Sequence, residues 1–332
     1  MSSTELNPRR SRNRSGKRLS IVAPVFNEQE VLEMFFGRLQ AVLAPLAMDY
    51  EIICVNDGSK DHSLAILLAR HHQDSRIKVI DLARNFGKER ALSAGLDAAT
   101  GDLVVPIDVD LQDPPELIAD FLDQWEAGFD VVYGVRMDRA ADTRLKRWTS
   151  RAFYKVFNRL SDTHMPPDAG DFRLMDRRVV EVLKSLPEAN RFMKGLFAWV
   201  GFRQVGVPYS RPERAAGVTS WRYWTLWNFA LDGILAFSSV PIRIWTYIGL
   251  AAGLLAIAFA GFITLNTLLH GRDVPGYSSL AVMILLGFSL QSLAIGTLGE
   301  YISRIYSEVK GRPIYVVMDR YGLEEDPPRE GS

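Results

Sequence analysis

The stretch Leu103-Val104-Val105-Pro106-Ile107-Asp108-Val109-Asp110-Leu111-Gln112-Asp113-Pro114-Pro115 decides the fold. Its apolar first part predicts a buried strand, which ends in three carboxylates and an amide, and the two prolines permit a helix to begin near Glu116. In an open α/β sheet, ligands bind beyond the carboxyl ends of the strands. Carboxylates this close repel one another unless a cation holds them, and hard oxygen ligands suit Mg²⁺ or Mn²⁺. An Asp-x-Asp pair alone is equally compatible with a solvated acidic turn.

The preceding chain alternates strand-like and helix-like patterns. Strands are predicted over residues 19–26, 51–55, 77–82, 103–107 and 130–135, with helices over 28–43, 63–72, 89–99 and 116–127. This alternation predicts an α/β domain with a mostly parallel sheet and helices on both faces. Polar residues follow several of the strands, so we expect them to meet along one edge of the sheet.

Two later segments, residues 244–269 and 274–299, contain no Asp, Glu, Lys or Arg. Each exceeds the roughly 20 apolar residues needed to cross a bilayer, and core helices of this length would be unusual. A short linker at 270–273 predicts a two-helix transmembrane hairpin within residues 244–306. Basic residues flank it, Arg243 before and Arg304, Lys310 and Arg312 after. The positive-inside rule therefore predicts a multi-pass membrane protein with both termini in the cytoplasm.

Composition narrows the function further. Lys plus Arg and Asp plus Glu both number 39, so no excess of positive charge indicates a nucleic-acid partner. The single cysteine, Cys54, excludes a disulfide framework within the chain. Residues 1–18 are strongly basic and are predicted to form a disordered tail, with attraction to anionic lipid as an additional possibility. Residues 307–332 are predicted to form a cytosolic C-terminal tail, disordered towards its acidic, proline-containing end.

Two further segments are predicted to contact the membrane surface. Residues 139–160 combine apolar side chains at helical spacing with many basic ones, a pattern typical of an interfacial amphipathic helix. The same stripe could instead pack on the sheet. Residues 222–243 are rich in aromatics and predict a juxtamembrane helix that leads into the first span.

Four motifs give the chain a family resemblance. Pro24-Val25-Phe26-Asn27-Glu28, Asn56-Asp57-Gly58-Ser59, Asn85-Phe86-Gly87-Lys88 and the acidic stretch at 108–115 occur in this order. Together they resemble the family-2 glycosyltransferases with the GT-A fold. More narrowly, they resemble the polyprenyl-phosphate glycosyltransferases, which include dolichol-phosphate mannose synthase and bacterial undecaprenyl-phosphate glucosyltransferases. The resemblance covers about residues 19–316 and implies a cytosolic GT-A domain over residues 19–221.

The resemblance implies roles for particular residues. The set expected to bind the nucleotide sugar is Pro24, Phe26, Glu28, Asp57, Lys88 and Asp108, and the set expected to bind the metal is Asp108, Asp110 and Gln112. A divalent cation, Mg²⁺ or Mn²⁺, would offset the negative charge that grows on the leaving diphosphate. Asp57 could alternatively only shape its turn, since Asx residues favour turns.

Two later elements supply the remaining candidates. Asp168-Ala169-Gly170-Asp171-Phe172-Arg173 resembles a family element near the sugar and acceptor, which makes Asp171 the candidate catalytic carboxylate and Asp168 the second choice. Asp171 could instead orient the sugar or cap the helix predicted at 179–186. Residues 214–221 resemble an Arg-x-x-Gly-x-Ser/Thr-Lys element, although Ser220 stands where many members have Lys. Arg136, Arg214 and Ser220 are the predicted acceptor-phosphate ligands, unless this basic loop is merely solvated.

The resemblance thus implies an inverting, metal-dependent transfer of a sugar from a nucleotide diphosphate to a polyprenyl phosphate, at the cytoplasmic face of a bacterial inner membrane. UDP-glucose and undecaprenyl phosphate are the favoured substrates, for cell-envelope glycan modification. A mannose, amino-arabinose or N-acetylglucosamine donor, a processive synthase and a non-catalytic membrane scaffold are the alternatives. Glycines in both spans would permit close helix association, hence a homo-oligomer.

Overall fold

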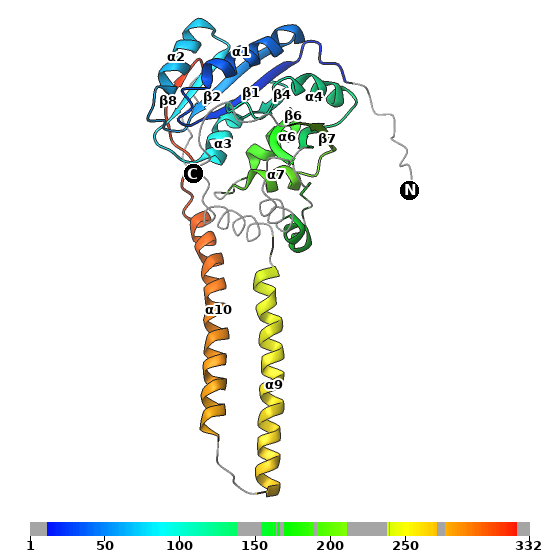
Figure 1. The fold of residues 1–332 in the computed structure, drawn as a ribbon, viewed down its shortest axis with the longest axis vertical. Coiled ribbons are helices and arrows are strands. Elements are labelled where there is room, and N and C mark those ends of the chain that lie inside the picture. The colour runs from blue at the N-terminus through cyan, green and yellow to red at the C-terminus, as the bar shows by residue number, and fades with distance from the viewer. Residues whose placement is uncertain are drawn as a thin grey trace.

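A computed structural model describes residues 12–137, 154–161, 163, 165–166, 169–186, 188, 191–210, 238, 240–270 and 276–323. Within these residues the strands form one eight-stranded sheet in the order β7-β5-β6-β4-β1-β2-β3-β8. Two long helices extend from the domain that contains this sheet (Figure 1). The predicted α/β class, with a mostly parallel sheet followed by two long apolar helices, is confirmed.

The first half of the domain follows the predicted alternation. Its parallel strands are β1 (Arg18–Val25), β2 (Asp49–Asn56), β3 (Ile77–Leu82) and β4 (Leu103–Pro106). The connecting helices are α1 (Leu32–Leu43), the 3₁₀ turn η1 (Ala44–Leu46), α2 (Ser63–Gln73), α3 (Lys88–Ala98) and α4 (Leu117–Glu126). The sequences of these strands are almost continuously apolar because helices cover both faces of the sheet.

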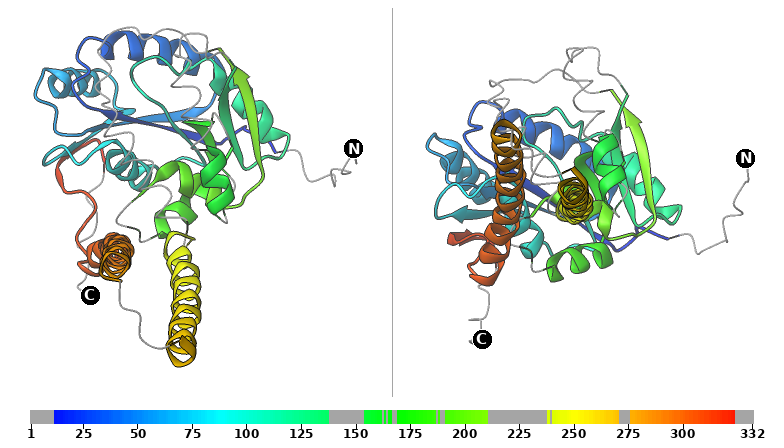
Figure 2. Two further views of the ribbon diagram at one scale, coloured as in Figure 1. Left: turned by 60° about the horizontal axis from the view of Figure 1, so that its bottom comes forward. Right: turned by 90° about the horizontal axis from the view of Figure 1, so that it is seen from below.

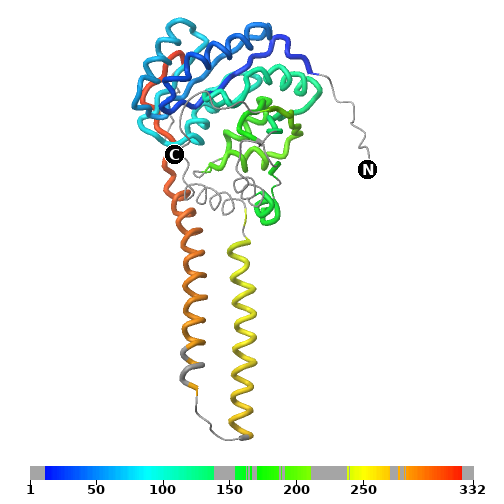
Figure 3. Tube along the Cα trace, viewed as in Figure 1, coloured from blue at the N-terminus to red at the C-terminus, as the bar shows by residue number. Residues whose placement is uncertain are grey.

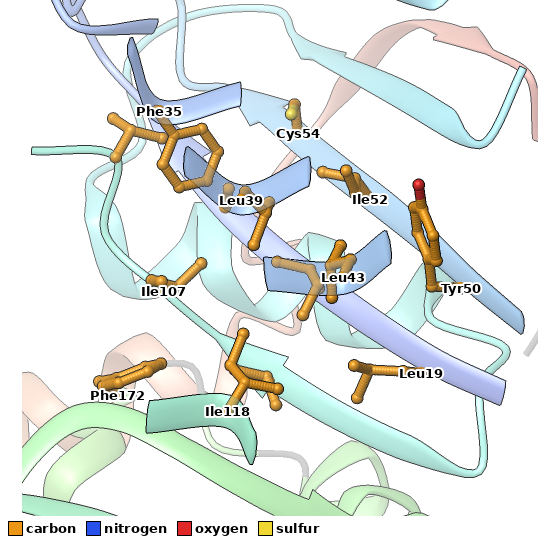
Figure 4. Packing of buried hydrophobic residues seen from close by; sticks show 14 of the residues in the cluster. Leu19, Phe35, Leu39, Leu43, Tyr50, Ile52, Cys54, Ile107, Ile118 and Phe172 are labelled. Carbon is orange, nitrogen blue, oxygen red and sulfur yellow. The ribbon is translucent and has the colours of Figure 1, made fainter. Parts of the chain in front are cut away.

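Two buried clusters hold the layers together. Side chains of α1, including Phe35, Leu39 and Leu43, pack on Leu19 of β1 and Ile52 of β2 (Figure 4). A second cluster on the opposite face joins α3 to α6 (Arg177–Ser185) and α7 (Met193–Trp199). Each fully buried Leu or Phe stabilises the fold by roughly 1.5–3 kcal/mol.

The other half of the sheet contains elements that the sequence patterns did not predict. Strand β6 (Ala169–Asp176) lies between β4 and β5 (Val131–Arg136) and runs antiparallel to both. Strand β7 (Gln204–Tyr209) then pairs parallel with β5 at the edge. The side chain of Asp176 accepts a hydrogen bond from Arg178 N and caps α6. The interpretation of Asp171 as this helix cap is therefore wrong.

Helices α9 (Val240–His270) and α10 (Tyr277–Val309) are long and apolar enough to cross a membrane. They extend from the same face of the domain (Figures 1 and 2), and Trp245 Nε1 donates a hydrogen bond to Thr297 Oγ1 at 3.0 Å. Most of their large apolar side chains are exposed. Helix α9 begins four residues before the predicted span and so includes Arg243. The predicted interfacial helix falls largely outside the described residues, although 154–160 are helical, and most of the predicted juxtamembrane helix does so as well.

The C-terminal prediction needs correction. After α10, the chain turns back and adds β8 (Val317–Tyr321) antiparallel to β3 (Figure 3). Tyr315 Oη donates a hydrogen bond to Asp97 Oδ2 at 2.7 Å, which fixes the connection to α3. Residues 317–321 are thus part of the sheet rather than of a free tail, because the edge of β3 offers unpaired backbone groups.

The N-terminal prediction also needs correction for the described part of the tail. Arg12 Nη2 lies 2.5 Å from Asp130 Oδ1, and the guanidinium stacks 5.3 Å from the Trp125 ring centroid. Arg14 pairs with Glu126 at 2.9 Å. The basic side chains of residues 12–17 therefore pair with carboxylates of the folded domain, those of Arg14 on α4 and those of Arg12 on β6 and the loop before β5. Residues 1–11 lie outside the described part.

Candidate active site

Polar segments follow the carboxyl ends of β1 and β2 and bind each other. Asn27, at a left-handed φ of 54°, donates from its backbone N to Ser59 Oγ at 3.0 Å and accepts from Lys60 N at 2.8 Å. Glu28 N donates to Ser63 Oγ at 2.9 Å. The ring of Phe26 is exposed, as expected for a side chain offered to a ligand. These hydrogen bonds therefore fix the predicted nucleotide-binding segment against the loop that follows β2.

The side chain of Asp57 binds backbone amides of a neighbouring loop. Its Oδ1 accepts a hydrogen bond from Phe86 N at 2.7 Å, and its Oδ2 accepts one from Gly87 N at 2.9 Å. The side chain is buried, and this burial raises its pKa even though both amides favour the ionised form. Asp57 thus shapes the loop that precedes α3, which supports the turn interpretation. A nucleotide contact of Asp57 stays a prediction.

The acidic loop after β4 is fixed in a strained conformation. Leu111 has φ of 59°, a region that costs a non-glycine residue about 1–2 kcal/mol. Asp110 is buried and accepts from Gln112 N at 3.1 Å. Buried Tyr209 of β7 donates from its hydroxyl to Asp113 at 2.6 Å. Strained backbone that neighbouring contacts enforce is common where a ligand must be positioned.

Lys88 joins two carboxylates from distant parts of the chain. Its Nζ lies 2.8 Å from Asp108 Oδ2 and 2.8 Å from Asp171 Oδ2. Asp108 follows β4 and Asp171 belongs to β6, so the antiparallel insertion of β6 brings them together. The second oxygen of Asp171, Oδ1, is buried and has no hydrogen-bond partner among the described residues. An unpartnered carboxylate oxygen is available for a substrate hydroxyl.

The charges around Asp171 determine its ionisation. Burial opposes the charged form, but the positive charges of Lys88 and Lys194 outweigh it and hold the pKa of Asp171 well below its usual range. The two carboxylates raise the pKa of Lys88 despite its desolvation. Glu89 differs, because burial first and the charge of Asp171 second raise its pKa to about 7. An ionised carboxylate and a readily protonated one therefore lie close together.

A small pocket lies next to this cluster, lined by Tyr133, Met165, Pro166, Arg173, Lys194, Ala198 and Gln204. Arg173 is buried and stacks on Phe197, with its guanidinium carbon 3.8 Å from the ring centroid. It donates to Gly170 O at 2.7 Å and so braces the backbone beside Asp171. Sequence reasoning missed Glu89 and Lys194 as members of the site. Both lie on helices and are near Asp171 only in the fold.

The acidic loop fits a divalent cation that is shared with a substrate. No group of three or more His, Cys, Asp or Glu side chains able to hold a metal occurs in the described part of the chain. Mg²⁺, however, is usually held by one or two carboxylates together with substrate phosphates. Asp108 and Asp110, with the amide of Gln112, match such a donor set.

The predicted acceptor ligands are only partly described. Arg136 ends β5, is half-buried, and its Nε is a buried donor without a hydrogen-bond partner among the described residues. It lies close enough to Tyr209 to oppose the rise in the pKa of that phenol, which burial and the charge of Asp113 drive well above its usual range. Asp168, Arg214 and Ser220 lie outside the described residues.

Comparison with known proteins identifies relatives along almost the whole chain. A family model described as glycosyl transferase family 2 matches residues 20–184. An uncharacterized glycosyltransferase of Synechocystis is 54% identical over 306 residues, or 92% of this chain and 96% of the relative. A prophage-derived bactoprenol glucosyl transferase of Shigella flexneri is 47% identical over 300 residues, or 90% of this chain and 97% of the relative. Among solved structures, glucosyl-3-phosphoglycerate synthase of Mycobacterium tuberculosis with Mn²⁺, UDP-glucose and phosphoglyceric acid aligns at a TM-score of 0.44 and 19% identity, covering 67% of this chain and 79% of that one.

Proposed function

The chain belongs to glycosyltransferase family 2, and from this premise we propose that it transfers glucose from UDP-glucose to undecaprenyl phosphate, with inversion at the anomeric carbon. The choice of acceptor and sugar rests on the similarity to the Shigella bactoprenol glucosyl transferase, which covers 90% of this chain and so includes α9 and most of α10. The site supports the same reaction, because it gathers carboxylates, an ammonium and a guanidinium at the carboxyl edge of the sheet.

The donor diphosphate would lie beside the acidic loop, within reach of Lys88. Asp108, Asp110 and Gln112 would hold Mg²⁺ or Mn²⁺, which when bound offsets the charge on the leaving diphosphate. Lys88 adds a positive charge on the other side of Asp108, 2.8 Å from its carboxylate. The exposed Phe26 and the half-buried Pro24 and Glu28 provide the surface for the nucleoside.

Asp171 would orient the reacting groups rather than remove a proton from the nucleophile. A phosphate monoester is already largely ionised at neutral pH, so its attack needs no strong base. The Oδ1 of Asp171, which has no hydrogen-bond partner in the described part of the chain, is instead suited to accept a hydrogen bond from a sugar hydroxyl. Holding the sugar and the acceptor phosphate in line supplies much of the rate.

Arg136 would bind the acceptor phosphate, helped by Arg214 and Ser220. The Arg136 Nε that lacks a partner among the described residues can donate to a phosphate oxygen, and guanidinium geometry suits bidentate phosphate binding. Helices α9 and α10 would cross the bacterial inner membrane with both chain termini in the cytoplasm. The acceptor lipid cannot leave the bilayer, so this anchor would keep the site within reach of its phosphate.

Transfer from a panel of radiolabelled UDP- and GDP-sugars to undecaprenyl phosphate tests the proposal. The purified protein, Asp110→Ala and the matched control Asp120→Ala, which removes an exposed carboxylate from α4, are assayed with Mn²⁺ or EDTA. We expect a glucosyl lipid with Mn²⁺ from the wild type and the control, and none from Asp110→Ala. A wild type that is folded but yields no lipid product from any donor would refute the proposal.

A further inference from the structure

The ammonium of Lys88 occupies an unusual position, between the carboxylate predicted to bind metal and the carboxylate predicted to act on the sugar. Both contacts are 2.8 Å, short enough for charge-assisted hydrogen bonds. The two carboxylates are 63 positions apart in the sequence, since one is Asp108 and the other is Asp171. One side chain therefore connects the two functional halves of the site.

The backbone holds Lys88 at this position. Lys88 is the first residue of α3, and Gly87 before it has φ of 97°, in the region that favours glycine. The amides of Phe86 and Gly87 are bound by the buried carboxylate of Asp57. The two residues before Lys88 are thus anchored beyond the end of β2, which limits the positions that the ammonium can reach.

Lys88 also determines how Asp171 is oriented. By binding Oδ2, it leaves Oδ1 as the buried oxygen without a partner among the described residues. The side chain of Asp171 is 17% exposed, so few water molecules can compete for it. Loss of the ammonium would leave the carboxylate of Asp171 free to rotate. The hydrogen bond that Oδ1 is proposed to accept from the sugar would then no longer have a fixed direction.

Two cations compete for Asp108 but not for Asp171, namely the ammonium of Lys88 and the predicted metal ion. The Oδ2 of Asp108 is bound by the ammonium, yet Asp108 is also expected to bind the cation of the donor complex. The Asp108 and Lys88 side chains are 26% and 41% exposed, so exchange of partners is sterically open. Two cations cannot both lie close to one carboxylate oxygen without repulsion.

Resting on the proposed function, we propose that Lys88 is a positioning residue that couples donor binding to the orientation of Asp171. Without cation and donor, its ammonium binds both Asp108 and Asp171. When a divalent cation and a nucleoside diphosphate bind, Lys88 releases Asp108 and keeps Asp171. The released donors of its ammonium are then directed at the diphosphate.

Binding of Mn²⁺ to the purified full-length protein, measured by electron paramagnetic resonance without donor and with UDP, tests this competition. The variants are Lys88→Met and Lys88→Gln, which remove the competing charge, and Lys88→Arg, which keeps it. Lys194→Met is the matched control, because it removes a charge near Asp171 that makes no ion pair with Asp108 among the described residues. Without donor, we expect both neutral variants to bind Mn²⁺ about fivefold more tightly, the effect of one lost, partly exposed ion pair. Lys88→Arg and Lys194→Met should stay within about twofold of the wild type, less than a typical surface pair contributes.

The kinetic parameters provide a second readout. Both neutral variants should have a lower kcat for transfer than the wild type, with a smaller change in KM for UDP-glucose, because Asp171 loses its orientation after the donor has bound. A residue with only a structural role would not increase metal affinity when replaced. Thermal unfolding of each variant verifies that it is folded, and a neutral variant that unfolds is replaced by the other.

The failures are distinguishable. Mn²⁺ affinity in a folded neutral variant that equals or falls below that of the wild type overturns the role of Lys88, as does a wild type that binds no Mn²⁺. If a neutral variant fails to bind Mn²⁺ more tightly but the wild type transfers sugar, only the role of Lys88 is overturned and the proposed function is retained. A wild type that binds Mn²⁺ and UDP but transfers no sugar would instead overturn the proposed function.

Discussion

Glu89 should destabilise the folded protein at alkaline pH, and its replacement should reverse this. Its pKa rises from 4.5 to about 7, because burial and the negative Asp171 disfavour its ionised form more than Lys88 and Lys194 favour it. An acid with a raised pKa in the fold lowers the free energy of unfolding as pH rises from the unfolded-state pKa to the folded-state pKa. The window is therefore about pH 4.5 to 7.

The full shift in the pKa of Glu89 corresponds to a loss of about 3 kcal/mol in the free energy of unfolding at pH 8. Glu89 is only half-buried, and solvent screening reduces the expected effect to about 1–2 kcal/mol. Glu89→Gln should therefore raise the free energy of unfolding at pH 8 by this amount and by much less at pH 5. For a domain of this size, the corresponding rise in Tm is about 2–8 °C.

Thermal unfolding followed by tryptophan fluorescence at pH 5 and pH 8 measures the effect. Glu181→Gln is a suitable control, because this exposed glutamate of α6 makes only surface ion pairs. The reasoning is refuted if Glu89→Gln unfolds at the wild-type temperature at pH 8. It is refuted equally by a stabilisation that has the same size at pH 5.

Three other substitutions test contacts that stabilise the folded domain. Tyr209→Phe removes the 2.6 Å hydrogen bond to Asp113 and should lower the free energy of unfolding by about 2 kcal/mol. The loss is measured as a fall in Tm, and an unchanged Tm would contradict this role of the hydrogen bond. Burial opposes the ionisation of Glu51, but its hydrogen bonds outweigh this effect and lower its pKa from 4.5 to about 2. The stability that Glu51 contributes is therefore present above pH 4.5 and is lost as the pH falls towards 2. Glu51→Gln should thus have a lower Tm than the wild type at pH 7 and a smaller further loss on acidification, and parallel pH profiles would argue against this. Gly58→Ala should destabilise by at least about 1 kcal/mol, since φ is +66° and the added Cβ would lie 2.6 Å from the Arg84 carbonyl carbon; a wild-type Tm would exclude this strain.

The parallel half of the fold could be predicted from the sequence because its signals are local. Each strand from β1 to β4 is an apolar run bounded by turn residues, and each intervening helix has its own periodicity. Strand β6 has no comparable signal, since it contains Asp171 and Arg173 and depends on pairing with two strands far away in the chain. Strand β8 is short and partly exposed, so its apolar pattern is weak.

The site shows the same division between local and long-range information. Motif resemblance singled out Asp108 and Asp171 separately, but neither motif indicates that one lysine lies between them. The basic tail was predicted to be disordered because composition cannot reveal the acidic partners of Arg12, which belong to β6 and the loop before β5. The nucleotide contact predicted for Asp57 stays a prediction, and its hydrogen bonds to the amides of Phe86 and Gly87 could not be foreseen, because they join segments that meet only in the fold.

The length of α10 has a further consequence. Its 33 residues extend about 50 Å, whereas the hydrocarbon core of a bilayer is about 30 Å thick. Under the proposed topology, about two fifths of the helix therefore lies outside the hydrocarbon core, and the short connection to β8 transmits its direction to the sheet. The helix thus sets the height of the site above the membrane surface. Inserting one helical turn into its cytosolic end would lift the domain by about 5.4 Å and withdraw the site from a phosphate that cannot follow it.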